Sequence, residues 1–189
     1  MRRLSEWSYE RATWTRAGIA SAVFAFFLWG PLRWQSARTE QYAGDEGAPD
    51  TRLWYSPNVL HDAAERFGPE GRRSYVVSRA TFDVVWPVVY ATSLTTVLSV
   101  LLRDSAPSGT RRRMANVLPW VGFAFDMAEN VAVSTVMVRH PEPTPAVERI
   151  APVMTLAKWV AVGTSTALVV ALPCGTAARR GWSALRSRT

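Results

Sequence analysis

The stretch NVLPWVGFAFDMAENVAVSTVMV, residues 116–138, decides how the rest of the chain is interpreted. As a helix it is long enough to cross a hydrocarbon core of about 30 Å, for which about 20 residues suffice. Its middle nevertheless carries Asp126, Glu129 and Asn130. A carboxylate at the centre of a bilayer costs about 2.5 to 3.5 kcal/mol on insertion scales, so two in one span require buried partners or water. The pattern therefore predicts a membrane protein with a polar interior.

Three further blocks of the chain are almost free of charge. They cover 17–32, 80–102 and 150–178, and their only charged residues are Asp83 and Lys158. Each block can supply a membrane-spanning helix, the first by extension to its flanking tryptophans. We therefore expect an all-α fold, a four-span transmembrane helical bundle, in a single membrane domain of 189 residues. The expected spans are about 14–34, 76–102, 115–138 and 151–174, with an external loop and short amphipathic helix at 35–70.

The net charge of +7 follows a topological pattern. Arginines cluster before the first span, between the second and third spans, and after the fourth span, which is the positive-inside arrangement. The segment 35–78 has five arginines against seven acids and belongs outside. We expect an integral protein of the bacterial plasma membrane with both termini cytoplasmic, its basic clusters meeting anionic lipid headgroups. A nucleic-acid partner is not expected, because no aromatic-interleaved basic groove accompanies the charge.

The expected external segment has two parts. Residues 35–55 are rich in Gly, Asp and Glu and are expected to form an irregular loop. Ser56 and Pro57 then form a helix start, and apolar residues recur with helical spacing until Gly68 and Pro69 end the helix. This amphipathic helix should lie on the outer membrane surface or cap the bundle. The next helix is expected to begin near residue 70 and run without a break to 102. We expect Arg72, Arg73 and Arg79 at the outer membrane interface.

One face of the second expected span carries two charged residues, a proline and a tyrosine. Arg79, Asp83, Pro87 and Tyr90 follow one another at steps of four, four and three, so they share a helix face. This face can line a polar cavity. The alternative is an interfacial ion pair between Arg79 and Asp83, with Pro87 as an ordinary kink of a membrane helix.

Lys158 is the single lysine among 22 basic residues, and it lies well inside the fourth span. At 1.5 Å per residue from the outer boundary, Asp83 is about 5 Å deep, Lys158 about 9 to 12 Å, Glu129 about 13 Å and Asp126 about 18 Å. Lys158 and Glu129 are therefore expected to pair, while Asp126 has no assigned cation. The predicted polar pocket lies in the outer half of the membrane and consists of Asp83, Tyr90, Asp126, Glu129, Asn130 and Lys158.

Several kinds of chemistry are not expected. Both histidines, His61 and His140, fall outside the expected spans, so no metal site is predicted. The one cysteine, Cys174, excludes a CxxC motif, no Gly-rich phosphate loop occurs, and no cofactor is expected.

Three functions remain open. The first is a pocket that binds a lipid or another amphipathic small molecule, with Asp126 and Glu129 as candidate proton carriers if the protein is an enzyme. The second is a structural or assembly subunit with a membrane-protein partner, in which the polar groups only hold the bundle together. The third is a proton- or ion-coupled pore.

The chain reads GPEGRRSY at 68–75, TFDVVWPVVY at 81–90 and LPWVGFAFDMAEN at 118–130. In these motifs it resembles a family of small, uncharacterised four-helix bacterial integral membrane proteins. The resemblance spans roughly residues 55–138. It implies four helices and draws attention to Asp83, Asp126, Glu129 and Asn130, but it implies no activity.

Overall fold

The computed structural model describes residues 2–44, 47–105 and 115–186; its side chains are described up to residue 173, except those of residues 2, 50, 104 and 105. Arginines 111–113 and the side chains of Cys174 and the C-terminal arginines lie outside the described residues. The described residues are mostly helical and contain no strand, which confirms the predicted all-α class. The helices are α1 (Arg2–Arg11), α2 (Trp14–Trp29), α3 (Pro31–Ala43), α4 (Pro57–Ala80), α5 (Phe82–Ser105), α7 (Leu118–Arg139) and α8 (Pro145–Arg186), with a short 3₁₀ turn at Pro49–Thr51.

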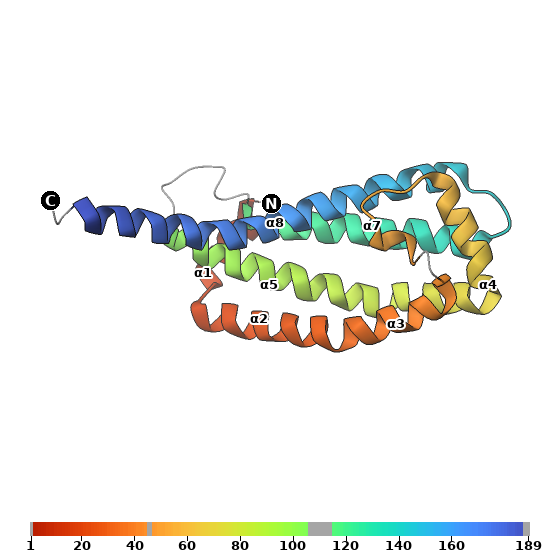
Figure 1. Cartoon of the computed structure of the whole chain (residues 1–189), viewed down its shortest axis with the longest axis horizontal. Coiled ribbons are helices and arrows are strands. Elements are labelled where there is room, and N and C mark those ends of the chain that lie inside the picture. Colours follow the sequence, from red (N-terminus) through yellow and green to blue (C-terminus); the bar gives the residue numbers. More distant parts are fainter. Residues whose placement is uncertain (1, 45–46, 106–114, 187–189) are drawn as a thin grey trace.

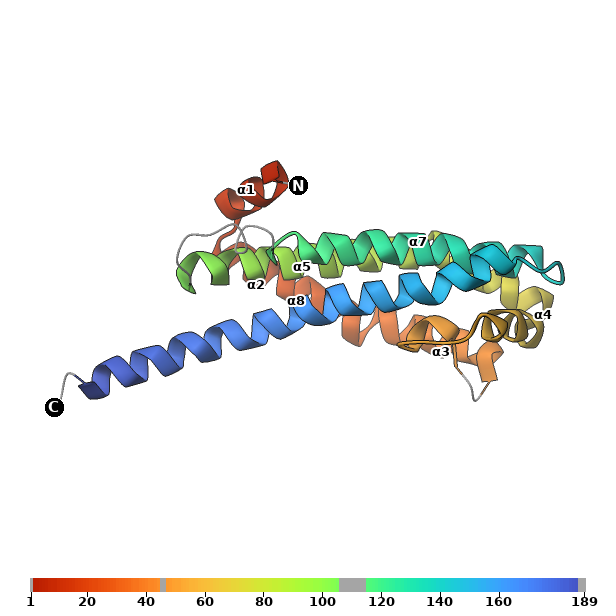
Figure 2. The same cartoon turned by 90° about the horizontal axis from the view of Figure 1, so that it is seen from above.

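The long helices run side by side as a bundle. Helices α5, α7 and α8 pack on one another, α2 packs along α5, and α3 continues α2 along α4 (Figures 1 and 2). Helix α4 folds over one end of the bundle and α1 lies at the other end, so the two ends are named here the α4 end and the α1 end.

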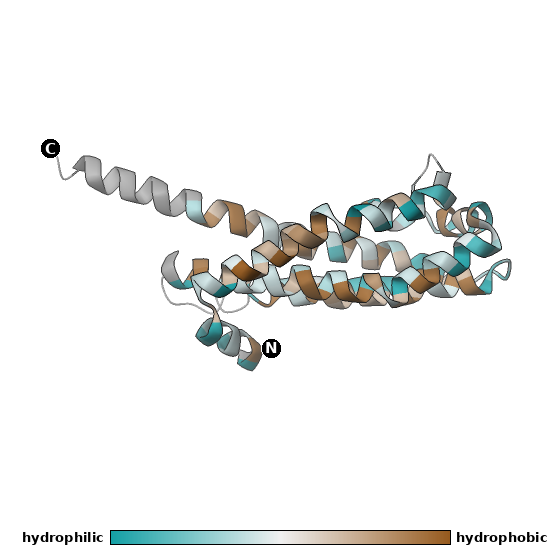
Figure 3. Ribbon diagram, turned by 90° about the horizontal axis from the view of Figure 1, so that it is seen from below, coloured by the Kyte–Doolittle hydropathy of each residue, from teal (hydrophilic) through white to brown (hydrophobic). Residues whose placement is uncertain are grey.

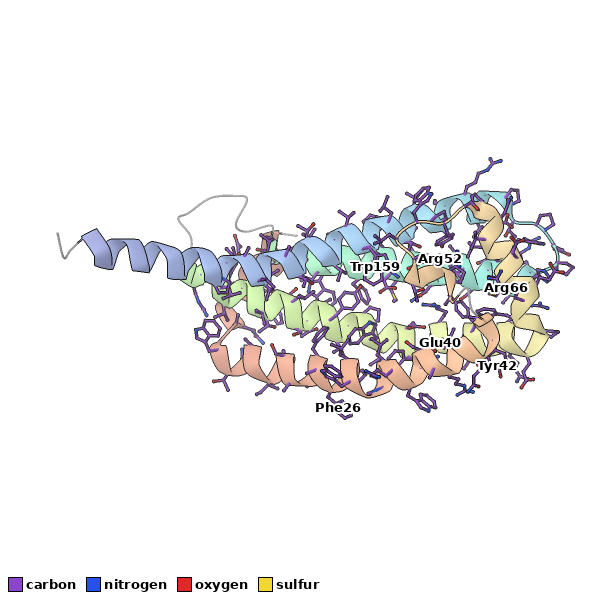
Figure 4. The ribbon with its side chains drawn as sticks, viewed as in Figure 1. Phe26, Glu40, Tyr42, Arg52, Arg66 and Trp159 are labelled. Atoms are coloured by element: carbon purple, nitrogen blue, oxygen red, sulfur yellow. The ribbon has the colours of Figure 1, made fainter. Side chains whose placement is uncertain are left out.

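Four helical segments of the described chain are long and apolar enough to cross a membrane, which fits a multi-pass membrane protein. Their outer faces carry large apolar side chains; Phe26, for example, is 66% exposed and points away from the bundle (Figure 4). Hydrophilic residues gather at the α4 end (Figure 3). Such an extensive exposed apolar surface is unfavourable in water and favourable in lipid. The four segments are Trp14–Ala43, Pro57–Arg103, Leu118–Arg139 and Pro145–Pro173.

The first span continues further than the sequence suggested. The irregular loop expected from residue 35 is wrong for 35–43, which is the helical continuation α3. Gly30 leaves helical geometry, and Pro31 starts a new helix in the position that proline favours. Packing then holds α3 against α4: Gly71 approaches Tyr42 so closely that an added Cβ would lie 2.9 Å from its side chain. This contact joins residues far apart in sequence, so local composition did not indicate it.

Helix α4 consists of two segments that meet at Gly68. Gly68 has φ of +62°, a conformation that glycine adopts readily, and Pro69 begins the second segment. The guanidinium of Arg72 donates to the carbonyl oxygen of Ala64 at 2.8 Å and so caps the first segment across the bend. The first segment, 57–67, is the predicted short amphipathic helix. Its buried face packs against α7 and α8 at the end of the bundle through Leu60, Ala63, Ala64 and Phe67.

Two other expected boundaries differ from the structure. The helix expected to run unbroken from 70 to 102 is interrupted at Thr81, whose hydroxyl donates to the carbonyl oxygen of Val77 at 2.7 Å. Helix α8 begins at Pro145 instead of near 151, because Glu148 accepts hydrogen bonds from the backbone and hydroxyl of Thr144 and thereby caps the helix start.

Candidate functional site

The site begins with the close approach of α7 and α8. A Cβ placed on Gly122 of α7 would lie 2.8 Å from Cγ2 of Val162 on α8, so the glycine leaves the space that the Val162 side chain occupies and lets the two helices approach closely. One turn and two turns further along α7, Asp126 and Glu129 lie on the same side of the helix as Gly122. The glycine contact therefore brings the acidic face of α7 within reach of α8.

Lys158 of α8 contacts both acids of α7. Its ammonium donates a short hydrogen bond to Oε2 of Glu129, and its Nζ lies 3.6 Å from Oδ1 of Asp126. Glu129 is fully buried and Lys158 is 7% exposed. A buried carboxylate remains charged only when a cation or several hydrogen bonds stabilise it, and Lys158 provides this cation for both acids.

Neutral donors complete the coordination of the two acids. The hydroxyl of Tyr90 donates to Oδ2 of Asp126 at 3.0 Å. Oε1 of Glu129 accepts a short hydrogen bond from the hydroxyl of Thr155, whose Oγ1 lies 3.2 Å from the hydroxyl of Tyr55. The five residues Tyr90, Asp126, Lys158, Glu129 and Thr155 thus form one continuous network, named here the lysine cluster, with Tyr55 beside it.

The sequence did not point to Thr155 or Tyr55. Thr155 stands three residues before Lys158 and so shares its helix face, a spacing that could have identified it. Tyr55 precedes α4 in a non-helical segment, where no periodicity indicates which way a side chain points.

A second group of buried polar residues lies where α4, α5 and α7 meet. The guanidinium of Arg79 donates to Asn130 at 3.2 Å and to the hydroxyl of Tyr75 at 2.6 Å, and it lies 3.4 Å from Oδ2 of Asp83. The side-chain amide of Asn130 donates to the backbone carbonyl of Asp83 at 3.0 Å. These four residues, Arg79, Asn130, Tyr75 and Asp83, are named here the arginine cluster.

A polar link joins the arginine cluster to α3. Ser78 donates to Oδ2 of Asp83 at 3.1 Å and accepts from the side-chain amide of Gln35 at 2.5 Å. Asp83 therefore connects three helices through its side chain and its backbone.

The arginines placed at the interface from the sequence divide into two kinds. Arg79 is 9% exposed and belongs to the arginine cluster inside the bundle. Arg73 is exposed, and Arg72 is half-buried because it caps the first segment of α4. Arg79 is drawn inward because Asp83 and Asn130 both present oxygens to it.

The two clusters face one cavity of about 560 Å³ between α2–α3 and the helices α5, α7 and α8. Its polar wall includes Asp83, Arg79, Tyr90, Asp126 and Lys158, and Gln35, Thr39 and Glu40 of α3 lie opposite. Its apolar wall is formed mainly by Phe24, Leu28, Leu32, Trp86, Leu94 and Val162. Trp159 of α8 and Glu40 of α3, both labelled in Figure 4, also line it.

This geometry divides the residues proposed for the pocket. Asp83, Tyr90, Asp126 and Lys158 line the cavity. Glu129 and Asn130 lie behind this lining, where they hold Lys158 and Arg79 in place through hydrogen bonds. Asp126 is therefore the carboxylate of α7 that a molecule in the cavity would meet.

No protein-family model, curated protein or solved structure matches the chain. The site is accordingly interpreted from its own residues and geometry.

Proposed function

We propose that this protein binds an amphipathic molecule, a lipid or a lipid-like small molecule, in the cavity between α2–α3 and α5–α8. The polar head lies against Asp126, Lys158 and the arginine cluster. The apolar part lies along Phe24, Leu28 and Leu32 of the first span and Leu94 of α5. The observation that carries this proposal is one cavity with a charged wall and an apolar wall, since ligand sites are concave and mainly apolar with a few placed polar groups.

The charge count of the two clusters supports a particular kind of head group. Two cations, Arg79 and Lys158, accompany three acids, Asp83, Asp126 and Glu129. Glu40 adds a further acid to the lining of the cavity. Burying an excess of negative charge is costly, so a bound proton or a ligand group that donates hydrogen bonds offsets it. A head rich in hydroxyl or amine donors meets this requirement better than a phosphate diester does.

The interpretation in which the polar residues only hold the bundle together accounts for Glu129, which is closed in by Lys158 and Thr155. It does not account for the cavity beside Asp126 and Asp83, because an adhesive contact gains nothing from adjacent space. If the bound molecule is chemically altered, Asp126 is the group placed to exchange a proton with it, and Glu129 sets the position of Lys158.

The orientation in the membrane is part of the same proposal. We infer from the arginine clusters that both termini lie in the cytoplasm of a bacterial cell and that the α4 end lies outside its plasma membrane. The charged wall of the cavity then opens toward the outer half of the bilayer, where lipid headgroups and external amphiphiles can reach it.

The test is retention of an amphiphile by the purified protein. Native mass spectrometry and lipid analysis of the detergent-extracted protein should show one class of amphiphile bound at about one molecule per chain. Leu94→Trp fills the cavity from α5 and should abolish retention. The matched control is Val85→Trp on the same helix, where the side chain is 47% exposed, and it should retain the amphiphile. Equal retention by both variants would contradict the proposal.

A further inference from the structure

A second cavity lies at the α1 end of the bundle. It has a volume of about 540 Å³ and is formed where α1 and the first turns of α2 meet α5 and α7. Its walls are mainly apolar and include Trp7, Ile19, Val88 and Trp120. No residue that lines it also lines the cavity between α2–α3 and α5–α8. It is named here the α1 groove.

Specific hydrogen bonds hold α1 in the position that forms this groove. The hydroxyl of Ser5 donates to the side-chain oxygen of Asn116 at 2.7 Å, and the Asn116 amide donates to the Ser5 carbonyl and to the hydroxyl of Ser99, each at 3.1 Å. All three residues are buried. A buried polar network that is fully paired fixes one arrangement, so the groove is a built feature of the fold.

Arg103 of α5 fastens the other end of α1. Its guanidinium donates to the carbonyl oxygens of Tyr9 at 3.1 Å and of Ala12 at 2.6 Å. Since the last carbonyls of a helix lack partners within it, this contact caps α1 and sets the angle at which the chain enters α2.

The charged residues that line the α1 groove are two arginines and no acid. The guanidinium of Arg11 lies 4.9 Å from the ring centre of Trp7, and Arg16 donates to the backbone carbonyl of Arg11 at 2.6 Å. Neither arginine makes an ion pair with a described residue. Two exposed cations therefore stand together at the rim of an apolar groove.

Thr95 provides an independent observation. It lines the α1 groove, it is 5% exposed, and its hydroxyl has no hydrogen-bond partner in the described part of the chain. A buried hydroxyl without a partner is costly and is rare in folded proteins. An acceptor such as an ester carbonyl of a molecule in the groove would satisfy it once the Thr95 side chain rotates toward the groove.

We infer that the α1 groove binds an anionic glycerophospholipid. The phosphate lies between Arg11 and Arg16, because a guanidinium bonds a phosphate through paired, charge-assisted hydrogen bonds. One acyl chain lies along Ile19, Val88 and Trp120, and an ester carbonyl faces Thr95. This site is separate from the proposed amphiphile cavity, and it fixes the angle of α1 against the membrane surface. The charge complementarity selects an anionic lipid over a zwitterionic one with the same chains.

The test compares phosphatidylglycerol with phosphatidylcholine of identical acyl chains. Both are titrated onto the full-length protein in detergent, and bound lipid is counted by native mass spectrometry. Wild type should bind phosphatidylglycerol more tightly. Arg11→Gln combined with Arg16→Gln should weaken this binding about tenfold or more, since two charge-assisted contacts are lost. The matched control is Arg33→Gln with Arg38→Gln, which removes two exposed arginines that also lie over tryptophans, and it should bind as wild type does.

Two outcomes would overturn the inference. One is no preference for the anionic lipid in wild type, and the other is an equal loss of binding in the Arg33/Arg38 control, which would indicate a general effect of net charge.

A second variant keeps both arginines. Val88→Trp fills the groove and should weaken phosphatidylglycerol binding, whereas Val85→Trp should not. Unchanged binding by Val88→Trp would show that no acyl chain occupies the groove. None of these variants touches the amphiphile cavity, so the two proposals can fail separately.

Discussion

Lys158 of α8 and Asp126 of α7 lie on neighbouring helices with their charged atoms, Nζ and Oδ1, 3.6 Å apart. The same ammonium also bonds Glu129, so one cation serves two carboxylates. The two acids are not equivalent, because Glu129 is fully buried whereas Asp126 lines the cavity. Under the proposed function this difference gives the pair two roles that mutation can separate: Glu129 positions the lysine, and Asp126 faces the amphiphile.

The first prediction concerns the stability of the lysine cluster. Lys158→Met keeps the length of the side chain but leaves Glu129 and Asp126 without their shared cation. Removing one partner of a buried ion pair costs about 3 to 5 kcal/mol, so this variant should melt at a much lower temperature or fail to insert. Glu129→Gln combined with Lys158→Met removes both charges of the closed pair and should recover the part of the loss that is due to Glu129, while Asp126 keeps its hydrogen bond from Tyr90 but not its cation. Thermal unfolding in detergent measures both variants, and a double variant no more stable than Lys158→Met would contradict the pairing.

The second prediction concerns binding. Asp126→Asn preserves the shape of the side chain and an oxygen that can accept from Tyr90, and Lys158 retains Glu129 as its partner. The melting temperature should therefore change little. Amphiphile retention should nevertheless fall about tenfold or more, because the charged group facing the cavity is lost. Lipid analysis of the purified variant measures the effect. Full retention would remove Asp126 from the binding site, and a change in proton flux into proteoliposomes would instead favour the pore.

The control for this prediction is Asp62→Asn. Asp62 lies on the first segment of α4 and lines none of the cavities described above. The substitution removes one carboxylate from the α4 end and changes no residue of the lysine cluster or the arginine cluster. Amphiphile retention in this variant should equal that of wild type.

Much of the fold and part of the candidate site could be predicted from the sequence. Charge-free blocks identified the four spans because a bilayer penalises charge strongly enough to exclude it from most positions. Depth matching paired Lys158 with Glu129, and the structure has this contact. It left Asp126 without a cation, because counting residues along separate helices ignores how closely they pack. Gly122 brings α8 near enough for one lysine to reach both acids.

What the sequence did not indicate depends on contacts between distant segments. Residues 35–43 are polar enough to resemble a loop, yet they form α3 because Tyr42 packs over Gly71 of α4. The sequence analysis placed Arg79 at the outer interface, near the start of the second span and one turn before Asp83. The break at Thr81 and the oxygens of Asp83 and Asn130 place it inside the bundle.

The third prediction concerns the approach of α7 and α8. Gly122→Ala adds a methyl group that would lie 2.8 Å from Val162, a β-branched side chain with little freedom to move. Overpacking of this kind costs about 1 to 3 kcal/mol and should lower the melting temperature. Gly163→Ala is the matched control, since an added Cβ there has no atom within 4 Å, and it should be neutral or slightly stabilising. Similar melting temperatures for the two variants would show that the helices are not held at this distance.

The last prediction concerns pH and the α4 end. The ring of His140, which follows α7, lies with its centre 4.8 Å from that of His61 on α4. Partial burial and the nearby charges of Arg72 and His61 hold the pKa of His140 below its ordinary value of 6.5. A histidine whose pKa is lower in the folded state favours folding above pH 6.5, and this contribution is lost as the pH falls through the lowered pKa. The melting temperature of wild type should therefore decrease between about pH 6.5 and 5, and that of His140→Gln should decrease less. Parallel curves for the two proteins would contradict the assignment, whereas a smaller slope in His140→Gln would make this loop the acid-sensitive contact between α4 and α7.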